Sequence, residues 1–185
     1  RKVKYMSKAN KSNKAIKYRL YPNDEQKVMF AKTFGCCRFV YNQLLALQKQ
    51  RYKDGESHLS KLKSNEFATR TLKKDYDFLK EIDKFAVSNA VFHLADAYDR
   101  FFKKQNHFPK FKSKRKSKKS YTTNFTNNNI LIGKNVIKLP KVGMVKAVIH
   151  KLPKDDWKLK SVTVSQDSVG NYFASVLFEY EQEDI

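Results

Sequence analysis

The spacing of apolar residues changes twice along the chain. Residues 14–20 alternate between apolar and basic side chains, a period of two that is typical of a half-buried strand. Pro22 ends this strand, because proline lacks the N–H that a strand ladder needs. Apolar residues then recur every three or four positions as far as residue 103, and the period of two returns from residue 129 onward. The pattern therefore predicts a strand, a group of helices and a set of further strands.

The helical part begins with a strong start signal. Asn23, followed three residues later by Gln26, has the form of a capping box. The apolar stripe that follows is interrupted only at Gly35 and ends near Gly55. Because glycine weakens a helix interior, we expect two helices, or one kinked helix, in this segment.

Two further segments complete the helical unit. Residues 58–78 carry a weaker apolar pattern that indicates one or two short helices. Asp83 is a favourable N-cap, and the residues from Lys84 to about Lys103 place their apolar side chains on one stripe. Packing of apolar faces accounts for these stripes without a cofactor, so we expect a compact unit of three or four helices.

The last third of the chain predicts five short strands, with glycine, proline and asparagine in the turns between them. The predicted strands cover residues 129–132, 136–139, 145–149, 159–164 and 172–180. With residues 14–20 as a sixth strand, the expected fold class is α+β. Its architecture would be a small antiparallel β-barrel, of an OB-like or wedge type, with an inserted α-helical domain.

The same pattern divides the chain into four parts. Residues 1–14 are basic and polar, and we expect a mobile arm there that touches a phosphate backbone. The predicted parts are the basic arm with the first barrel strand (1–22), the helical domain (23–103), a basic and polar linker that contacts nucleic acid (104–128) and the remaining barrel strands (129–185).

The charge balance indicates a polyanionic partner. The chain carries 39 basic and 18 acidic residues, a net charge of +21, and self-repulsion of this size disfavours the compact state unless a polyanion neutralises it. Nucleic acid is the first choice and an anionic membrane surface the second. No apolar run approaches the roughly 20 residues of a spanning helix, and no signal-peptide pattern begins the chain. We therefore expect no membrane partner and a cytoplasmic protein.

Neither a metal site nor a disulfide framework is predicted. Cys36 and Cys37 are adjacent and lack the C-x-x-C spacing of a zinc knuckle. The four histidines are scattered, and none pairs with a second ligand at helical spacing. We therefore expect no metal ion or other cofactor, and a reducing compartment.

One stretch concentrates both charge and aromatic residues. Residues 103–119 carry nine Lys or Arg and no acid, with Phe108 and Phe111 among them, and residues 120–129 are Ser, Thr, Asn or Tyr apart from Phe125. Cations displace the counterions on phosphates, whereas flat rings and short amides meet bases. We therefore expect a nucleic-acid contact here; a disordered basic linker is the alternative.

Two groups of residues are candidates for contacts with phosphates or RNA. The basic stretch supplies cations that give affinity and salt dependence with little sequence preference. The second group lies on the predicted second helix, where an arginine that only caps the helical packing is an equal alternative. The candidates are Lys110, Lys112, Lys114, Arg115, Lys116, Lys118, Lys119, Arg38, Tyr41 and Asn42.

Several segments together resemble one known family. They are "RLYPNDEQ", "TFGCCRFVYN", "FPKFKSKRKSKKSYTTNF" with "NNNI", "IKLPKVGMVK" and "SVTVSQDSVGNYFASVLFEYE". Over roughly residues 14–181 the chain resembles the N-terminal half of TnpB, a family of transposon-encoded, RNA-guided DNA endonucleases ancestral to the type V CRISPR effectors. The resemblance implies a wedge barrel with an inserted recognition lobe. Together these hold a guide RNA scaffold and read a short transposon-adjacent motif on the target duplex.

The resemblance also implies what this sequence lacks. The family's RuvC-like nuclease domain holds three carboxylates around two divalent cations, and neither its opening motif nor the family's four-cysteine zinc insert is present here. We therefore expect no catalytic residue and no enzyme activity for this chain as given; divalent cations such as Mg²⁺ belong to the absent nuclease domain. A fragment of a longer nuclease is the first interpretation, and a naturally truncated relative that only binds is the second.

The resemblance assigns readout of the adjacent motif to the start of the last helix and to the Ser/Thr/Asn run. A helix start favours phosphate, and short polar side chains reach base edges. Core packing is an equal alternative for Phe85, and a turn is an alternative for Asn128 and Asn129. The candidates are Lys84, Phe85, Ser88, Asn89, Tyr121, Thr122, Thr123, Asn124, Thr126 and Asn127.

Three functions follow from these observations. The first is the guide-RNA-scaffold-binding and target-DNA-binding module of a TnpB-like nuclease, with guide RNA and double-stranded DNA as partners and a monomer on the RNA. The second is a guide-independent basic DNA- or RNA-binding protein, such as a regulator or a nucleic-acid chaperone. The third, an autonomous nuclease or transposase, needs a carboxylate cluster or a nucleophilic tyrosine beside an H-x-H pair, and the sequence contains no such pair.

Overall fold

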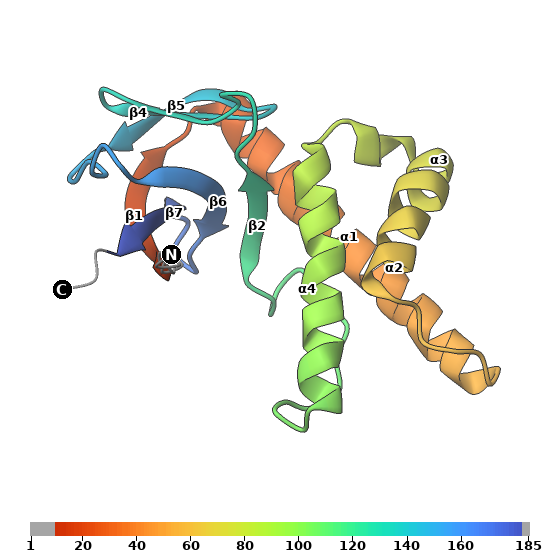
Figure 1. The fold of residues 1–185 in the computed structure, drawn as a ribbon. Helices are drawn as coiled ribbons and strands as arrows, with labels where there is room; N and C mark the ends of the chain where they lie inside the picture. Colours follow the sequence, from red (N-terminus) through yellow and green to blue (C-terminus); the bar gives the residue numbers. More distant parts are fainter. Residues whose placement is uncertain (1–9, 183–185) are drawn as a thin grey trace, which may run out of the picture.

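An open antiparallel sheet and a group of helices beside it make up the protein. The computed structural model describes residues 10–182. The strands are β1 (Asn10–Tyr21), β2 (Lys119–Asn124), β3 (Leu131–Gly133), β4 (Val136–Leu139), β5 (Gly143–Val148), β6 (Lys158–Gln166) and β7 (Tyr172–Gln182). The helices are α1 (Asp24–Lys53), α2 (Lys61–Phe67), α3 (Lys73–Asp75) and α4 (Lys84–Phe102). Figure 1 shows the helices to one side of the sheet.

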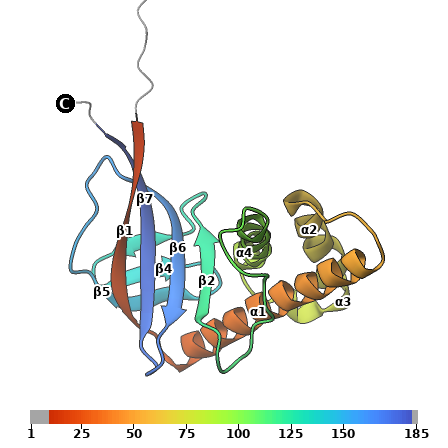
Figure 2. The same cartoon turned by 90° about the horizontal axis from the view of Figure 1, so that it is seen from below.

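The sheet has the order β2-β6-β7-β1-β5-β4-β3 with antiparallel neighbours. Strand β1 pairs with β7 from Asn10 to Leu20 but with β5 only over Arg19–Tyr21. Figure 2 shows β1, β7, β6 and β2 side by side. The α+β class is confirmed, but the barrel is not: within residues 10–182 no ladder joins the edge strands β2 and β3. Helices α1 and α4 pack against β2 instead, so the helices cover this edge where a barrel would close it.

Helix α1 runs without a break through Gly35. Its capping box is present as expected: the Gln26 N–H donates to Asn23 Oδ1 (2.9 Å), and the Asn23 N–H donates to Gln26 Oε1 (3.0 Å). The alternative of two helices is therefore wrong. The cost of an interior glycine, about 1 kcal/mol, is outweighed because both neighbouring positions, Phe34 and Cys36, are buried against the rest of the protein.

The segment between α1 and α4 contains the two short helices α2 and α3, as expected for residues 58–78. A π-helical turn (Ala68–Leu72) joins α2 to α3, and a 3-10 turn (Asp77–Lys80) follows. Helix α4 begins at the predicted cap, where the Phe85 N–H donates to Asp83 Oδ1 (3.1 Å). Its buried residues include Val87, Val91 and Leu94.

The helices and the sheet share one core. Phe30 on α1 is fully buried, and its ring centroid lies 5.6 Å from that of Tyr172 on β7 and 6.3 Å from that of Tyr121 on β2. Phe34, one turn later, lies 5.8 Å from Tyr121. This aromatic group fixes the sheet against the first half of α1, so the helical lobe cannot turn as an independent body without exposing it.

Two expectations about local structure need correction. Strand β2 lies inside the stretch predicted to be a linker, and residues 10–14, predicted to belong to a mobile arm, are part of β1. Residues 1–9 of that arm and residues 183–185 lie outside the described residues. No helix within residues 10–182 has the length and apolar character needed to cross a membrane.

Candidate nucleic-acid interface

The basic stretch forms an ordered loop that is fixed to α1. The Asn42 side chain makes two hydrogen bonds to the backbone of Lys112: Nδ2 donates to the Lys112 carbonyl oxygen (2.9 Å), and Oδ1 accepts from the Lys112 N–H (2.8 Å). Pro109, within the same loop, is buried. Asn42 was predicted to face nucleic acid; both ends of its amide are instead used to position the loop.

The tip of this loop is a closed turn from Ser113 to Ser117. The Ser113 N–H donates to Ser117 Oγ (2.9 Å), the Ser117 N–H donates to the Ser113 carbonyl oxygen (3.1 Å), and the Lys116 N–H donates to Ser113 Oγ (3.1 Å). The three side chains between the serines, Lys114, Arg115 and Lys116, are exposed. We call residues 113–117 the basic turn. It presents three cations from a backbone that is already ordered.

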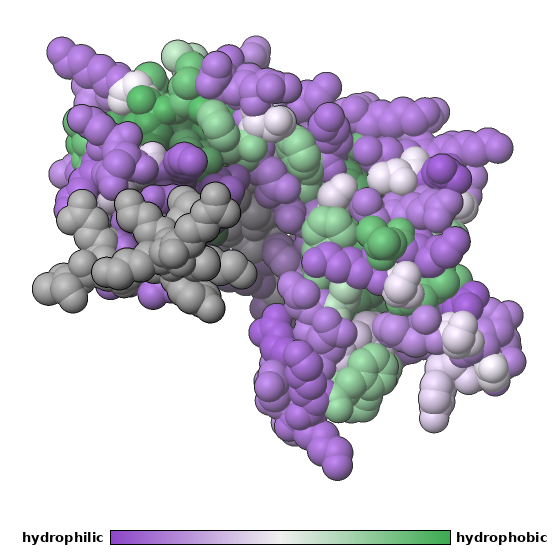
Figure 3. All heavy atoms as spheres, viewed as in Figure 1, coloured by the Kyte–Doolittle hydropathy of each residue, from purple (hydrophilic) through white to green (hydrophobic). Residues whose placement is uncertain are grey.

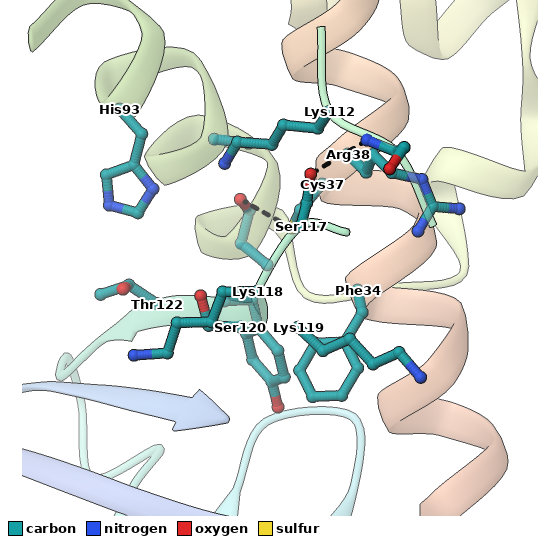
Figure 4. Close-up of a pocket in the computed structure, with 14 residues that line it drawn as sticks. Phe34, Cys37, Arg38, His93, Lys112, Ser117, Lys118, Lys119, Ser120 and Thr122 are labelled. Atoms are coloured by element: carbon teal, nitrogen blue, oxygen red, sulfur yellow. Dashed lines mark hydrogen bonds between the residues drawn. The ribbon is translucent and has the colours of Figure 1, made fainter. Parts of the chain in front are cut away.

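Beside the basic turn lies a cleft formed by four elements. Its walls come from α1, α4, residues 112–118 of the loop and β2. Figure 4 shows His93 on α4 and Arg38 on α1 on opposite sides of it. The basic residues that line it are Arg38, His93, Lys112, Lys118 and Lys119, and the residues that line it include no acid. The cleft therefore favours an anion.

Two of these basic groups are partly withdrawn from water. The Lys112 ammonium lies 4.2 Å from the centroid of the Tyr41 ring, and burial lowers the pKa of Lys112. Burial and the nearby Lys112 also lower the pKa of His93. Tyr41, a candidate for nucleic-acid contact, is itself buried. Its ring contacts Lys112 from within the core.

The candidates for motif readout divide into buried and accessible residues. Tyr121 and Thr123 have side chains only 3% and 0% exposed, because alternate residues of β2 face the core. Neither side chain can reach a base edge, which corrects the prediction for both. Phe85 and Ser88 are half-buried, and Lys84 is exposed.

The polar side chains of β2 that face outward are engaged with neighbouring elements. Asn89 Nδ2 on α4 donates to the Thr122 carbonyl oxygen (2.8 Å) and to Asn124 Oδ1 (3.2 Å). The Thr122 and Thr163 hydroxyls lie 2.9 Å apart and share a hydrogen bond. Asn89 thus joins the first half of α4 to the end of β2, which brings the two predicted motif-reading segments side by side (Figure 1).

A tight turn follows β2. Asn127 and Asn128 have positive φ values of 47° and 55°, which asparagine tolerates better than most residues. Asn129 closes the turn, because its Oδ1 accepts from the Thr126 N–H (2.8 Å) and its Nδ2 donates to the Asn124 carbonyl oxygen (2.9 Å). The turn that was the alternative interpretation for Asn128 and Asn129 is therefore present. Thr126 and Asn127 remain exposed at its tip.

The cations predicted to contact phosphate lie around the basic turn and the cleft. Lys110, Lys118 and Lys119 are exposed, as are the three cations of the basic turn, whereas Arg38 and Lys112 are half-buried at the cleft. The structure thus brings together cations from α1 and from the loop. Their contact with nucleic acid stays a prediction.

Sequence reasoning did not single out one basic surface. On the outward face of β1 and β7, the Lys17 ammonium lies 4.5 Å from the centroid of the Phe173 ring, and the Arg19 guanidinium lies 4.8 Å from that of Tyr21. Arg19 Nη2 also donates to Asn171 Oδ1 (2.8 Å). The alternation of residues 14–20 places Lys17 and Arg19 outward together, which was the signal available in the sequence.

The cysteines and the other potential metal ligands of the described residues lie apart from the cleft's charged lining, except for His93 and Cys37. Among residues 10–182, no group of three or more His, Cys, Asp or Glu side chains is placed to hold a metal ion. Cys36 and Cys37 are both buried, and burial raises the pKa of Cys37 to about 12, so its thiol is protonated at neutral pH. The expectation that the chain needs no cofactor stays a prediction.

Comparison with known proteins identifies the family. Residues 10–57 match the family model of the OrfB/IS605 type described as a helix-turn-helix domain. A "Putative RNA-guided DNA endonuclease" of Streptomyces pristinaespiralis is 31% identical over 168 residues, which cover 90% of this chain and 41% of the relative. A "Putative RNA-guided DNA endonuclease InsQ" of Escherichia coli (strain K12) is 30% identical over 174 residues, or 90% of this chain and 40% of the relative. The chain belongs to the TnpB family.

The chain matches only part of the length of these TnpB relatives. The chain spans about 40% of the length of these two curated proteins. A third relative, the "Virulence protein VsdF" of Salmonella dublin, is 32% identical over 111 residues, which cover 55% of this chain and 93% of that protein. Residues 10–57, which match the helix-turn-helix model, form β1 and the single helix α1, and this segment contains no second, recognition helix.

We expect Asn42→Ala to release the basic loop from α1. The change removes both hydrogen bonds to Lys112, and a lost half-buried bond costs about 1–3 kcal/mol. Hydrogen exchange at the Lys112 amide should therefore accelerate by roughly 5- to 150-fold. Gln43→Ala is the matched control, because Gln43 makes no side-chain hydrogen bond within residues 10–182. Equal exchange rates in the two variants would show that Asn42 does not hold the loop.

Proposed function

We propose that this chain is the guide-RNA-scaffold-binding and target-DNA-binding module of a TnpB-like RNA-guided DNA endonuclease. The observation that carries the proposal is the basic turn, whose three exposed cations stand on a hydrogen-bonded backbone next to a cleft lined by basic residues. A loop that is ordered before binding loses less entropy when a polyanion arrives. Family membership and the net charge of +21 support the same function.

In this proposal the residues before β2 contact phosphates, and the residues after β2 read the adjacent motif. The basic turn and Lys118 precede the strand and contact phosphates, which gives affinity and register but little sequence preference. The accessible motif-reading candidates lie at the other end: Lys84 and Ser88 on α4, and Thr126 and Asn127 in the turn after β2. Their hydroxyl and amide groups match the donors and acceptors of adenine and thymine edges. Asn89 positions this end through its bonds to Thr122 and Asn124.

The proposed role is binding, and phosphodiester cleavage is assigned to the parts of the TnpB relatives that this chain does not span. Such cleavage in the family uses divalent cations held by carboxylates, and the surfaces described above present cations and amides. The proposed partners are a guide RNA and a double-stranded DNA that carries a short A/T-containing motif.

The decisive experiment is to purify the chain with its bound nucleic acid intact and to sequence what is recovered. We expect one discrete RNA species that ends in transposon-end sequence. The complex of chain and this RNA should then retain a DNA duplex that matches the guide and carries the adjacent motif, and should release one with a scrambled motif. A mixture of unrelated RNA and DNA that moderate salt strips off together would overturn the guide-RNA role and identify a guide-independent basic binding protein.

A further inference from the structure

The C-terminal ends of α1 and α4 enclose a second hollow, distinct from the cleft. Its volume is about 740 Å³, and the aromatic residues that line it are Tyr52, Tyr98, Phe101, Phe102 and Phe108. We call this site the aromatic hollow. Figure 3 shows apolar surface between the ends of the two helices, bordered by hydrophilic side chains. Three of the rings come from α4, one from α1 and one from the basic loop, so only the folded chain assembles the site.

Several of these rings are exposed to solvent. Tyr52 is 86% exposed, Phe102 57%, and Phe108 and the neighbouring Phe111 are 40% and 51% exposed. Single exposed apolar residues are common on protein surfaces, but a cluster of large rings marks an interaction site. The exposed cluster is therefore a candidate site for binding another molecule.

Four of the five rings, all except Tyr52, pack against one another or against His58. Phe108 packs edge-on against Phe101 (5.1 Å between ring centroids) and Tyr98 (5.5 Å), and the His58 ring packs edge-on against Phe102 (5.3 Å). Both helices also end in fixed turns: the Glu56 N–H donates to the Arg51 carbonyl oxygen, and the Gln105 N–H donates to the Arg100 carbonyl oxygen (each 2.8 Å). Rigid rings lose little conformational entropy on binding.

The charge around the aromatic hollow is positive. The Lys49 ammonium lies 4.6 Å from the centroid of Phe111 and 5.5 Å from that of Phe108, and Lys53 lines the site. Lys103 and Lys104 follow Phe102 in the sequence and are exposed. The one acid among the lining residues is Glu56, and it forms a 2.7 Å ion pair with Arg51. The site therefore suits a partner that is flat, apolar on its faces and anionic.

We propose that the aromatic hollow stacks unpaired bases of a bound RNA, while the surrounding lysines contact the phosphates between them. Base–aromatic stacking tolerates any sequence, because every base has a π-face. Unpaired bases are offered by loops, bulges and ends of a folded RNA, whereas a DNA duplex keeps its bases stacked inside. This proposal rests on the proposed function and adds a second, sequence-tolerant RNA site at the end of the helical lobe.

The test compares two double variants of exposed residues. Tyr52→Ala with Phe102→Ala removes two rings, and Tyr52→Phe with Phe102→Tyr keeps them. The probes are an unstructured single-stranded RNA oligonucleotide that contains 2-aminopurine, a single-stranded DNA of the same sequence, and a blunt RNA duplex. Affinity is measured by fluorescence anisotropy at one salt concentration, and stacking by quenching of the 2-aminopurine fluorescence. Each stacked base that is lost should weaken binding of single-stranded RNA by roughly 5- to 150-fold.

Each outcome decides the proposal. It is supported if the alanine pair loses single-strand affinity and quenching, keeps duplex affinity, and the ring-keeping pair matches the unmodified chain. Equal affinities in all three proteins, or equal losses for single strand and duplex, overturn it and leave the proposed function intact. A loss of affinity for the single-stranded DNA alone also overturns the proposal. A dimer that the unmodified chain forms and the alanine variant does not form overturns it as well. If the unmodified chain binds no nucleic acid at all, the proposed function fails as well.

Discussion

Replacing Phe30 with alanine is expected to lower the free energy of unfolding by about 3–5 kcal/mol, the usual cost of removing a large buried aromatic side chain. The Phe30 ring is fully buried and lies between Phe34, Tyr121 and Tyr172. The substitution thus opens a cavity where α1 meets β2 and β7. Because a domain of this size is stable by only about 5–15 kcal/mol, the variant should lose a large share of its stability.

Urea unfolding followed by two probes measures this effect. Circular dichroism at 222 nm follows the helices, and the fluorescence of Trp157, which stacks on Tyr180 of the sheet (5.4 Å between ring centroids), follows the strands. Val28→Ala on the same helix is the control, since Val28 is 56% exposed; its effect should stay within about 0.5 kcal/mol. Both probes should shift together. A shift of the helical signal alone would contradict a core shared by helices and sheet.

The second large effect concerns the basic turn. Changing Lys114, Arg115 and Lys116 together to alanine should weaken binding of RNA or DNA by roughly 100-fold at about 150 mM salt, if all three contact phosphate. The slope of log affinity against log salt concentration should fall by about 0.9 for each contact with duplex DNA that is lost. No ion pair within residues 10–182 involves these side chains, so the fold should be unaffected.

A charge-matched control separates local contact from general charge. Lys134, Lys151 and Lys154 are exposed and lie in loops of the sheet away from the basic turn; changing all three to alanine removes the same net charge. We expect this control to lose less than about threefold in affinity, because a change in overall charge is screened within roughly 8 Å at this ionic strength. Titrations of both variants over a series of salt concentrations provide the comparison. Equal losses would mean that the basic turn has no special role.

Local sequence patterns determined many elements of this protein. The capping box at Asn23 and the N-cap at Asp83 depend on residues close in sequence, and both are present in the structure. The alternation of residues 14–20 and of the last strands predicted which of their side chains face the core, because a half-buried strand buries every second residue. Net charge and the basic stretch indicated a polyanionic partner. These signals are short-range or compositional, so one sequence is enough to find them.

Other features were decided by contacts between distant parts of the chain. Strand β2 was missed because its polar residues gave no apolar alternation, yet Tyr121 and Thr123 are buried there once α1 and α4 cover the edge. The same coverage leaves the sheet open where a barrel was expected. Gly35 does not break α1, because tertiary packing on both sides of it exceeds the cost of glycine in a helix.

The candidate site shows most clearly which features depend on the sequence alone and which depend on the tertiary structure. The sequence determined which cations and amides are available, but it assigned Asn42 and Asn89 to nucleic acid, whereas the fold uses both to fix the loop and β2. Which polar groups face outward depends on which partners the fold brings within hydrogen-bonding distance, often from more than thirty residues away. For the same reason the aromatic hollow, assembled from α1, α4 and the basic loop, is a property of the tertiary structure, while the excess of positive charge around it was already determined by the sequence.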